Sequence, residues 1–135
     1  MDARANADGF SQLKVIFELF VKLYEKKTDF LRFIYLFDAY AVKEKIPKDK
    51  MTSYESGILL VKQIISEAIQ KGIEDGSINA KYSKCGDALY FTLIHTFFST
   101  AQKLAISGNL LDMDSQMNGS KQLTLLADIL LEGLK

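Results

Sequence analysis

The sequence predicts an all-α protein, a five-helix antiparallel orthogonal bundle that forms a single domain over residues 1–135. Three observations indicate this fold class. The chain has one proline in 135 residues, whereas sandwiches and barrels need many turns, which are usually rich in proline and glycine. Apolar residues recur at the three- and four-residue spacing of a helix face through most of the chain. Hydrophobic residues make up 48% and charged residues 25% of the sequence, which indicates a globular domain rather than a disordered chain.

Amphipathic helices are predicted over residues 9–27 and 52–75. In the first of these, apolar residues such as Leu13 and Phe17 share one face, and charged residues occupy the other. In the second, Ile65 lies on an apolar arc, and the sequence Thr-Ser-Tyr-Glu at the start has the form of a capping box. Both patterns are typical of surface helices that pack on one side.

The helix predicted between them, over residues 29–45, differs because it is apolar on nearly every side. Thr28 is its expected N-cap, since its side chain can accept a hydrogen bond from the first turn. Arg32 and Asp38 are the only charged residues between positions 30 and 42. A helix of this kind is usually buried on most sides, so we expect it at the centre of the bundle.

Two glycines indicate how the third predicted helix ends. Gly72 lies within the apolar arc, where the lack of a side chain lets another backbone approach closely. Gly76 follows the last turn and can adopt the left-handed conformation that closes a helix, with Ile78 folding back onto the helix end. We therefore expect a helix terminus with a packing notch. A phosphate loop is not expected, because the Lys-Ser/Thr that follows such a loop is missing.

The last two helices, predicted over residues 83–107 and 120–134, form the most apolar part of the chain. Apolar residues sweep roughly 160° of the fourth helix, and the exclusively polar sector of the fifth is about 80° wide. A terminal helix in a domain of this size cannot hide so much apolar surface within its own chain. We therefore expect the two helices to form a four-helix interface across the two-fold axis of a homodimer. The residues expected at this interface are Leu93, Phe97, Thr100, Leu104, Leu126, Ile129, Leu130 and Leu134.

Composition argues against several classes of function. Lysine plus arginine number 17, and so do aspartate plus glutamate. The formal net charge is therefore zero, which makes direct contact with nucleic acid a poor expectation for this segment. Cys85 is the only cysteine, so no internal disulfide can form, which suits a reducing, cytoplasmic compartment. No apolar run approaches the roughly 20 residues that span a bilayer, and the polar N-terminus does not have the pattern of a signal peptide. We therefore expect no membrane partner.

The chain resembles the C-terminal domain of TetR-type transcriptional regulators. The resemblance lies in the order of five helices, the aromatic second helix, the helix terminus from Ala68 to Ile78 and the two strongly apolar closing helices. The resemblance covers nearly the whole chain, and its most specific motif is the helix end with Gly72, Gly76 and Ile78. It implies a helical core that binds a small, largely apolar effector, a dimer made by the last two helices, and a role in transcription regulation, as a repressor. The family's N-terminal helix-turn-helix domain is missing ahead of Gly9. Any contact with DNA is therefore expected from a domain that is not present in this chain.

The candidate effector site consists of aromatic residues with a few polar groups. Aromatic side chains at helical spacing either fill a solid core or line a pocket; the family resemblance favours the pocket. His95, the only histidine, either hydrogen-bonds an effector or is satisfied within the chain. Asp38 needs a partner, which Arg32, His95 or a cationic ligand could supply. The residues expected to bind the effector are Phe20, Tyr24, Phe37, Asp38, Tyr40, Tyr90, His95 and Phe98.

Two other functions remain open. One is a helical protein-interaction module that docks on a different protein through its apolar C-terminal helix. The other is an enzyme with Asp38 and His95 as an acid–base pair, which is the weaker alternative because no nucleophile or cofactor motif accompanies them. Cys85 and His95 lie nearly three helical turns apart, so neither a metal site nor a nucleophile–base pair is expected from them. We therefore expect a protein that is not an enzyme and needs no metal or cofactor.

Overall fold

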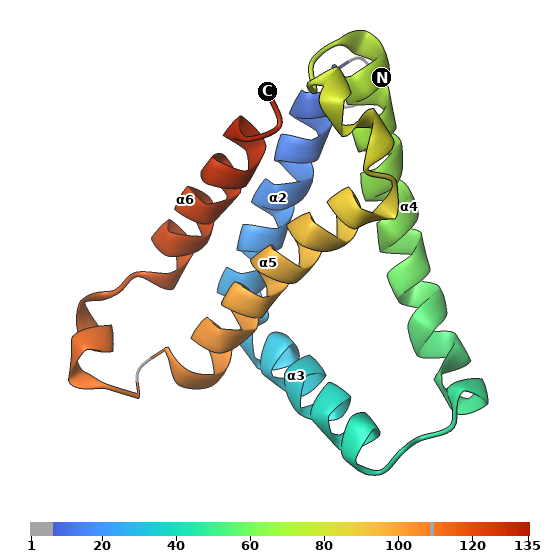
Figure 1. Ribbon diagram of the computed structural model, residues 1–135. Coiled ribbons are helices and arrows are strands. Elements are labelled where there is room, and N and C mark those ends of the chain that lie inside the picture. The colour runs from blue at the N-terminus through green and yellow to red at the C-terminus, as the bar shows by residue number, and fades with distance from the viewer. Residues whose placement is uncertain (1–6, 109) are drawn as a thin grey trace.

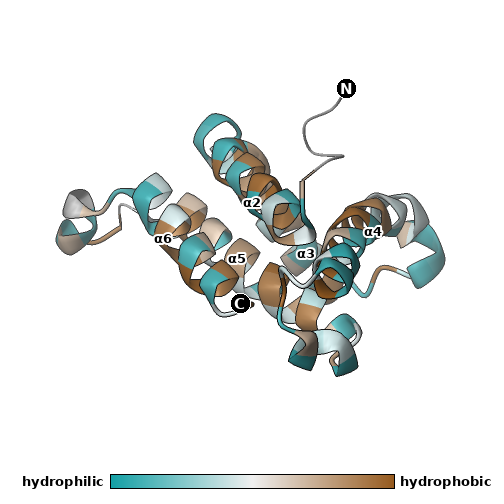
Figure 2. Ribbon diagram, turned by 90° about the horizontal axis from the view of Figure 1, so that it is seen from above, coloured by the Kyte–Doolittle hydropathy of each residue, from teal (hydrophilic) through white to brown (hydrophobic). Residues whose placement is uncertain are grey.

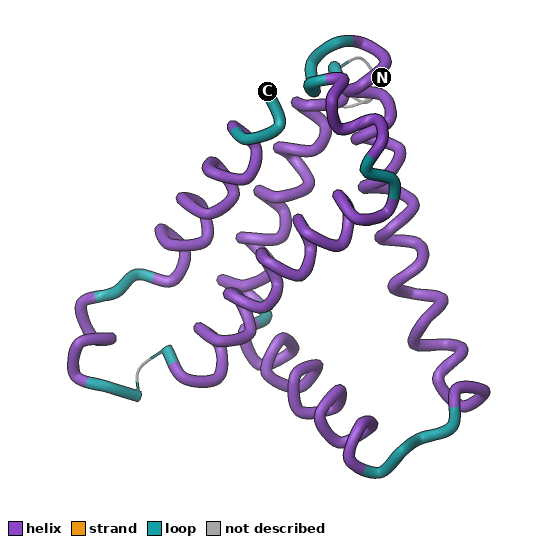
Figure 3. Tube along the Cα trace, viewed as in Figure 1, coloured by secondary structure: helices purple, strands orange, loops and turns teal. Residues whose placement is uncertain are grey.

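The computed structural model describes residues 7–108 and 110–135, and every regular element in these ranges is helical (Figure 1, Figure 3). The α-helices are α2 (Gly9–Lys26), α3 (Thr28–Lys43), α4 (Thr52–Asp75), α5 (Asp87–Ser107) and α6 (Gly119–Glu132). Three short 3-10 helices lie between them: η1 (Lys48–Met51), η2 (Ala80–Lys84) and η3 (Asp112–Gln116). The prediction of an all-α protein with five helices is confirmed.

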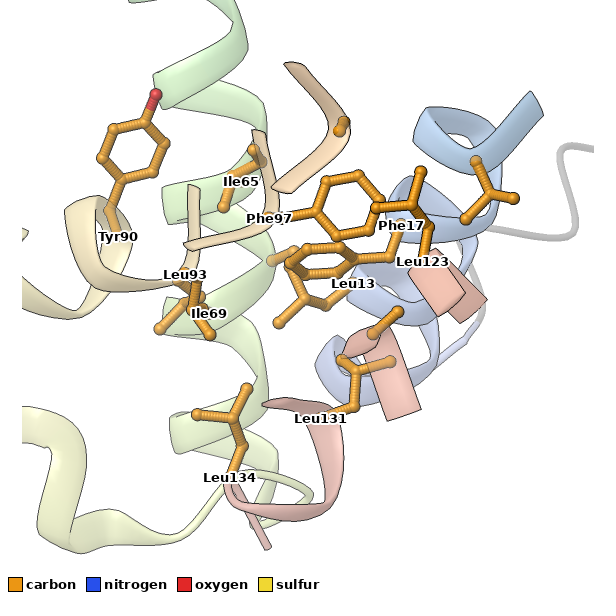
Figure 4. Close-up of a cluster of buried hydrophobic side chains, with 14 of the residues drawn as sticks. Leu13, Phe17, Ile65, Ile69, Tyr90, Leu93, Phe97, Leu123, Leu131 and Leu134 are labelled. Carbon is orange, nitrogen blue, oxygen red and sulfur yellow. The ribbon is translucent and has the colours of Figure 1, made fainter. Parts of the chain in front are cut away.

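The hydrophobic core lies where α2 packs against α4, α5 and α6. Its centre is the pair Phe17 and Phe97, whose rings meet edge to face with their centroids 5.2 Å apart. Leu13, Ile65 and Leu123 are fully buried around them, so that four helices each contribute to one cluster (Figure 4). Each such side chain stabilises the fold by about 1.5–3 kcal/mol through burial alone. This core fixes the relative positions of α2, α5, α6 and the second half of α4.

The position of α3 differs from the one expected from its sequence. Leu31 is its only buried residue, whereas Phe33, Leu36 and Tyr40 are 59%, 56% and 57% exposed. The expectation that this helix occupies the centre of the bundle is therefore wrong. The central position belongs to α2, because its apolar stripe packs against both α4 and α6. α3, which is apolar on nearly every side, thus leaves much of its apolar surface exposed to solvent.

The end of α4 has the structure that its glycines predict. Gly76 has a φ of +84° and closes the helix in the left-handed conformation. The chain then folds back, so that Ile78 is 1% exposed and its N–H donates to the Gly72 carbonyl oxygen at 2.9 Å. A Cβ atom on Gly72 would lie 2.5 Å from Cδ1 of Ile78. The predicted packing notch and fold-back are both confirmed.

The helix starts differ from the predictions in three places. Thr28 lies inside α3, and its hydroxyl donates to a carbonyl of the preceding helix instead of capping. The expected capping box of α4 is not formed, because the Thr52 hydroxyl donates to the Asp49 carbonyl oxygen of η1. The fourth predicted helix begins four residues later than expected, since Gly86, with a φ of +57°, separates η2 from α5. The starts of α4 and α5 are thus set by the 3-10 or loop segment before them, and that of α3 by the end of α2.

Candidate ligand-binding site

Three helices, α3, α4 and α5, form the sides of an open triangle in Figure 1, and we call them the α3–α4–α5 frame. At the α3–α5 corner, the Arg32 guanidinium donates from Nε and Nη2 to the Ala105 carbonyl oxygen at 3.1 and 2.9 Å. The other two corners are held by side-chain pairs described below. The first half of α4 extends beyond the core, since its buried residues begin at Ile65. The core therefore holds α5 and the second half of α4, whereas α3 and the first half of α4 contribute few buried residues.

The α3–α4 corner is an aromatic and acidic cluster. The rings of Phe37 and Tyr54 lie 5.2 Å apart at 53°, and the Tyr54 hydroxyl donates to Oδ1 of Asp38 at 2.6 Å. Phe33 stacks on Phe37 with a centroid distance of 6.1 Å. Burial raises the pKa of the Tyr54 phenol well above its ordinary value, and the adjacent Asp38 carboxylate raises this pKa further. Tyr54 thus stays protonated and donates its hydroxyl to Asp38.

The α4–α5 corner combines an ion pair with aromatic faces. The Lys62 ammonium lies 2.8 Å from Oδ2 of Asp87 and 5.6 Å from the ring centroid of Phe91. Phe91 in turn packs against His95, with centroids 5.4 Å apart. Burial raises the pKa of the Tyr90 phenol, while the positive charge of Lys62 opposes this shift. The side chain of Lys62 therefore joins two frame helices through both charge and cation–π contact.

Helical spacing from the corner contacts predicts which residues line the space between the frame helices. On α4, Tyr54 contacts α3 and Lys62 contacts α5, so Ile58, four residues from each, lies on the face between these contacts. On α5, Phe98 follows Phe91 by seven residues, about two turns, and so lies on the same side of the helix. Helical periodicity assigns to this lining Phe30, Ile34 and Phe37 of α3, Tyr54, Ile58 and Val61 of α4, and Phe91, Ile94 and Phe98 of α5.

Exposed apolar side chains concentrate on two sides of the frame. Of twenty large hydrophobic residues that are exposed in the described part of the chain, eleven lie on α3 and on α4 before Ile65. Figure 2 shows hydrophobic stretches distributed over α2, α4 and α5.

Five of the eight residues predicted to bind an effector belong to the frame or border it. Phe37 and Asp38 form the α3–α4 corner, and the Lys62 ammonium lies within 6.0 Å of the Tyr90 ring centroid. His95 is exposed beside Phe91, and Phe98 joins the frame to the core. Asp38 pairs with Tyr54 and Arg32 pairs elsewhere, so the expected Asp38–Arg32 and Asp38–His95 contacts are not formed among the described residues. Tyr54 and Lys62, which close two of the corners, are not among the residues predicted from the sequence.

The other three predicted effector residues lie outside the frame lining. Phe20 packs on Phe98, with centroids 4.8 Å apart, as part of the α2–α5 contact. Tyr40 is 57% exposed near the end of α3. Tyr24 borders a separate hollow of about 390 Å³ at the start of α6, lined also by Glu25, Thr28, Leu104, Gly108 and residues 117–120. The frame and this hollow are therefore distinct, and the eight residues do not form one site.

The residues predicted for a dimer interface divide into two groups. Leu93, Phe97 and Leu134 are 2%, 0% and 2% exposed, so the subunit's own core covers them and they offer no surface to a second copy. This corrects the expectation for these three. Ile129 is 60% exposed. The half-buried members of the predicted set are Thr100, Leu104, Leu126 and Leu130.

Within residues 7–108 and 110–135, no group of three His, Cys, Asp or Glu side chains is arranged to hold a metal ion. Cys85 is exposed and forms no disulfide. No helix in the same ranges has the length and hydropathy needed to cross a membrane. The hollows in the described part of the structure, of about 390 and 270 Å³, border α2 and α6 and lie outside the frame.

Comparison with protein-family models, with curated protein sequences and with solved structures finds no match to this chain.

Proposed function

We propose that this chain is the ligand-sensing and dimerisation domain of a TetR-like transcriptional regulator that responds to a small, largely apolar molecule. The observation that supports this proposal most strongly is the α3–α4–α5 frame, in which side-chain contacts hold the corners while the lining is apolar and partly exposed. Sites for small ligands combine a mostly apolar lining with a few polar groups. The resemblance in helix order and in the end of α4 supports the same function.

The proposed mechanism is a shift in population between arrangements of the frame. An effector that touches three helices at once stabilises the arrangement in which it fits best, and only its difference in affinity between arrangements carries a signal. α5 belongs both to the frame and to the contact with α6, so a change in the frame reaches the helices proposed for the dimer. In the complete regulator, proposed to be a cytoplasmic repressor, the DNA contacts belong to a helix-turn-helix domain outside this chain.

The proposed dimer is a four-helix contact between α5 and α6 of two orthogonal bundles related by a two-fold axis. The exposed Ile129, with the half-buried Leu126 and Leu130, forms an apolar stripe along α6. Thr100 of α5 is small enough to let a facing helix approach closely.

A second candidate function is a helical module that docks on an unrelated protein through α6. Leu125 and Ile129 are each 60% exposed, which favours a partner of some kind on this helix. A dimer of the purified chain supports the sensor domain. A monomer that associates only with a different protein supports the interaction module.

Binding of a neutral, apolar fluorescent probe, N-phenyl-1-naphthylamine, tests the sensor function. We expect saturable binding at one site per subunit, and at least a tenfold weaker affinity in Ile58→Asp, which places a charge in the frame lining. Leu19→Asp is the matched control, because Leu19 is 47% exposed on α2, as Ile58 is 45% exposed on α4. Binding that never saturates, or that both variants weaken equally, contradicts a site in the frame.

A further inference from the structure

The outer side of α2 carries four charged side chains of alternating sign, which we call the α2 charge stripe. Lys14, Glu18, Lys22 and Glu25 follow one another at intervals of three or four residues and are all exposed, so they occupy a sector about 80° wide. Opposite charges at this spacing can pair along one helix. Within the described part of the chain, however, no ion pair or side-chain hydrogen bond involves any of the four. Their charges are therefore available to a second surface.

The α2 charge stripe forms one rim of a groove between α2 and α6, which lie side by side (Figure 1). This groove is a hollow of about 270 Å³ whose lining includes Phe17 and Val21 of α2 and Ala127 and Leu131 of α6. Asp128 of α6 adds a negative charge to the opposite rim. A lysine side chain can cover apolar surface with its methylene stem while its ammonium group reaches a carboxylate. The groove therefore suits a second helix that presents lysines beside acids.

The order of charges in the stripe is complementary to itself when the helix direction is reversed. We consider two copies of α2 that lie antiparallel across a two-fold axis at about the level of Phe20. In this register, Glu18 lies level with Lys22 of the second copy, and Lys14 lies within one residue of the second copy's Glu25. Two-fold symmetry repeats both pairings. All four charges on each copy thus face an opposite charge.

Other registers of the same two helices bring like charges together. A shift by one helical turn in one direction sets Glu18 against its own copy and Lys14 against Lys22. A shift in the other direction sets Glu18 against Glu25, and a parallel pairing in register sets every charge against itself. Like charges that face each other across an interface repel and disfavour that arrangement. The pattern therefore selects one antiparallel register, and it identifies a second copy of this chain as the occupant that fits the groove.

We propose that two copies of this chain associate through the α2 charge stripe, antiparallel and across a two-fold axis at about the level of Phe20. This contact goes beyond the proposed function, because it does not use the α6 stripe of Leu126, Ile129 and Leu130. Where both contacts form, two dimers combine into a tetramer with two kinds of interface. Exposed ion pairs are individually weak and are screened by salt. The α2 contact is therefore expected at millimolar rather than micromolar chain concentration.

Sedimentation equilibrium of Ile129→Lys tests the α2 contact alone, because this substitution disrupts the contact proposed for α6. At millimolar concentration and low salt, the variant is expected to be a dimer. Raising NaCl from about 0.01 M to about 1 M shortens the Debye length from about 30 Å to about 3 Å, and it is expected to weaken this association at least fivefold. A monomer at every concentration in low salt overturns the α2 contact. The α5–α6 dimer is judged separately, from the wild-type chain at micromolar concentration.

Charge reversal identifies the surface that associates. In the Ile129→Lys background, Lys14→Glu/Lys22→Glu makes the stripe wholly acidic. In the same background, Glu18→Lys/Glu25→Lys makes it wholly basic. Each of these variants is expected to self-associate at least tenfold more weakly than Ile129→Lys, because like charges then face each other in every register. An equimolar mixture of the two is expected to recover the dimer, because every pairing is again between opposite charges.

Lys48→Glu/Lys50→Glu, also in the Ile129→Lys background, is the matched control. It reverses two exposed lysines of η1 and changes the net charge by the same amount as the acidic stripe variant, and it is expected to associate as Ile129→Lys does. An equal loss in this control, or a mixture of the two stripe variants that stays monomeric, overturns the α2 contact. Unchanged far-ultraviolet circular dichroism of each variant excludes unfolding as the cause of a loss.

Discussion

Gly9 at the start of α2 lies against the backbone of Gly72 in α4, and a Cβ atom on Gly9 would come within 2.0 Å of the Gly72 nitrogen and 2.4 Å of the Ala68 oxygen. The crossing is tied by polar contacts as well, since the Gly9 N–H donates to Oδ2 of Asp75 at 2.9 Å. Two helices thus approach to backbone contact at one point. This contact sets the angle from which α4 departs toward the frame.

Gly9→Ala is therefore expected to destabilise the fold, by about 2 kcal/mol or more, because backbone atoms cannot move aside as a flexible side chain can. Urea denaturation measures the loss. Gly57→Ala is the matched control: Gly57 lies inside α4, where an added Cβ meets nothing within 4 Å, and it is expected to stabilise by about 0.5–1 kcal/mol through helix propensity. Equal effects of the two substitutions contradict the close crossing.

The notch at the end of α4 predicts an energetic coupling between Gly72 and Ile78. A Cβ on Gly72 would lie 2.5 Å from Cδ1 and 2.6 Å from Cγ1 of Ile78, and Ile78→Ala removes both atoms. Each single alanine substitution is expected to destabilise, Ile78→Ala by about 2–5 kcal/mol. The double variant should be more stable than the sum of the two losses predicts, by about 1 kcal/mol or more. A double-mutant cycle in urea that gives additive losses contradicts the contact.

Asp75 predicts a pH dependence of stability on the acid side. The Ser77 hydroxyl, the Gly9 N–H and the Ser77 N–H all donate to its carboxylate and lower its pKa in the folded state. Because the folded pKa lies below the unfolded one, the contribution is present above about pH 4 and is lost as the pH falls through the folded value. Asp75→Asn and Ser77→Ala are each expected to flatten the decline in urea midpoint on acidification. A decline as steep as in the wild type counts against this role of Asp75.

Tyr54 predicts that the stability of the fold decreases as the pH rises into the alkaline range. Burial and the neighbouring Asp38 carboxylate raise the pKa of its phenol in the folded state. The stability gained from the protonated phenol is therefore complete below about pH 10 and declines as the pH rises toward the folded value. In a spectrophotometric titration of tyrosine ionisation, Tyr54→Phe should remove the component that titrates at the highest pH. Asp38→Asn should lower that component's pKa, and an unchanged value contradicts the Asp38–Tyr54 hydrogen bond.

Local patterns predicted much of this fold. Apolar periodicity gave the five helices, and the glycines with Ile78 gave the end of α4, because these features depend on neighbours within a few residues. The position of α3 could not be predicted in this way. A helix that is apolar on all sides can lie at the centre of a bundle or at its edge. In this protein α2 takes the central position, because Leu13 and Phe17 of α2 are buried in the core.

The candidate site was less predictable than the fold. Asp38 stood out in the sequence as an acid that needs a partner, but its partner Tyr54 lies beyond a loop, in a different helix. Nothing in the sequence indicated the ion pair of Lys62 either, because a lysine on the polar arc of an amphipathic helix usually faces solvent. Phe97 was expected at an interface and is core, because helical spacing identifies an apolar face without showing what covers it. Pairings between distant helices are a property of the tertiary structure.

Sedimentation equilibrium of the purified chain tests most directly whether α5 and α6 form the dimer of a sensor domain. We expect a mass of twice 15.2 kDa at micromolar concentration, and a monomer for Ile129→Lys, which places a charge on the exposed stripe of α6. Leu60→Lys, at a position 63% exposed on α4, should remain dimeric. A wild-type chain that sediments as a 15.2 kDa monomer at every concentration would contradict the dimer and with it the proposed sensor domain.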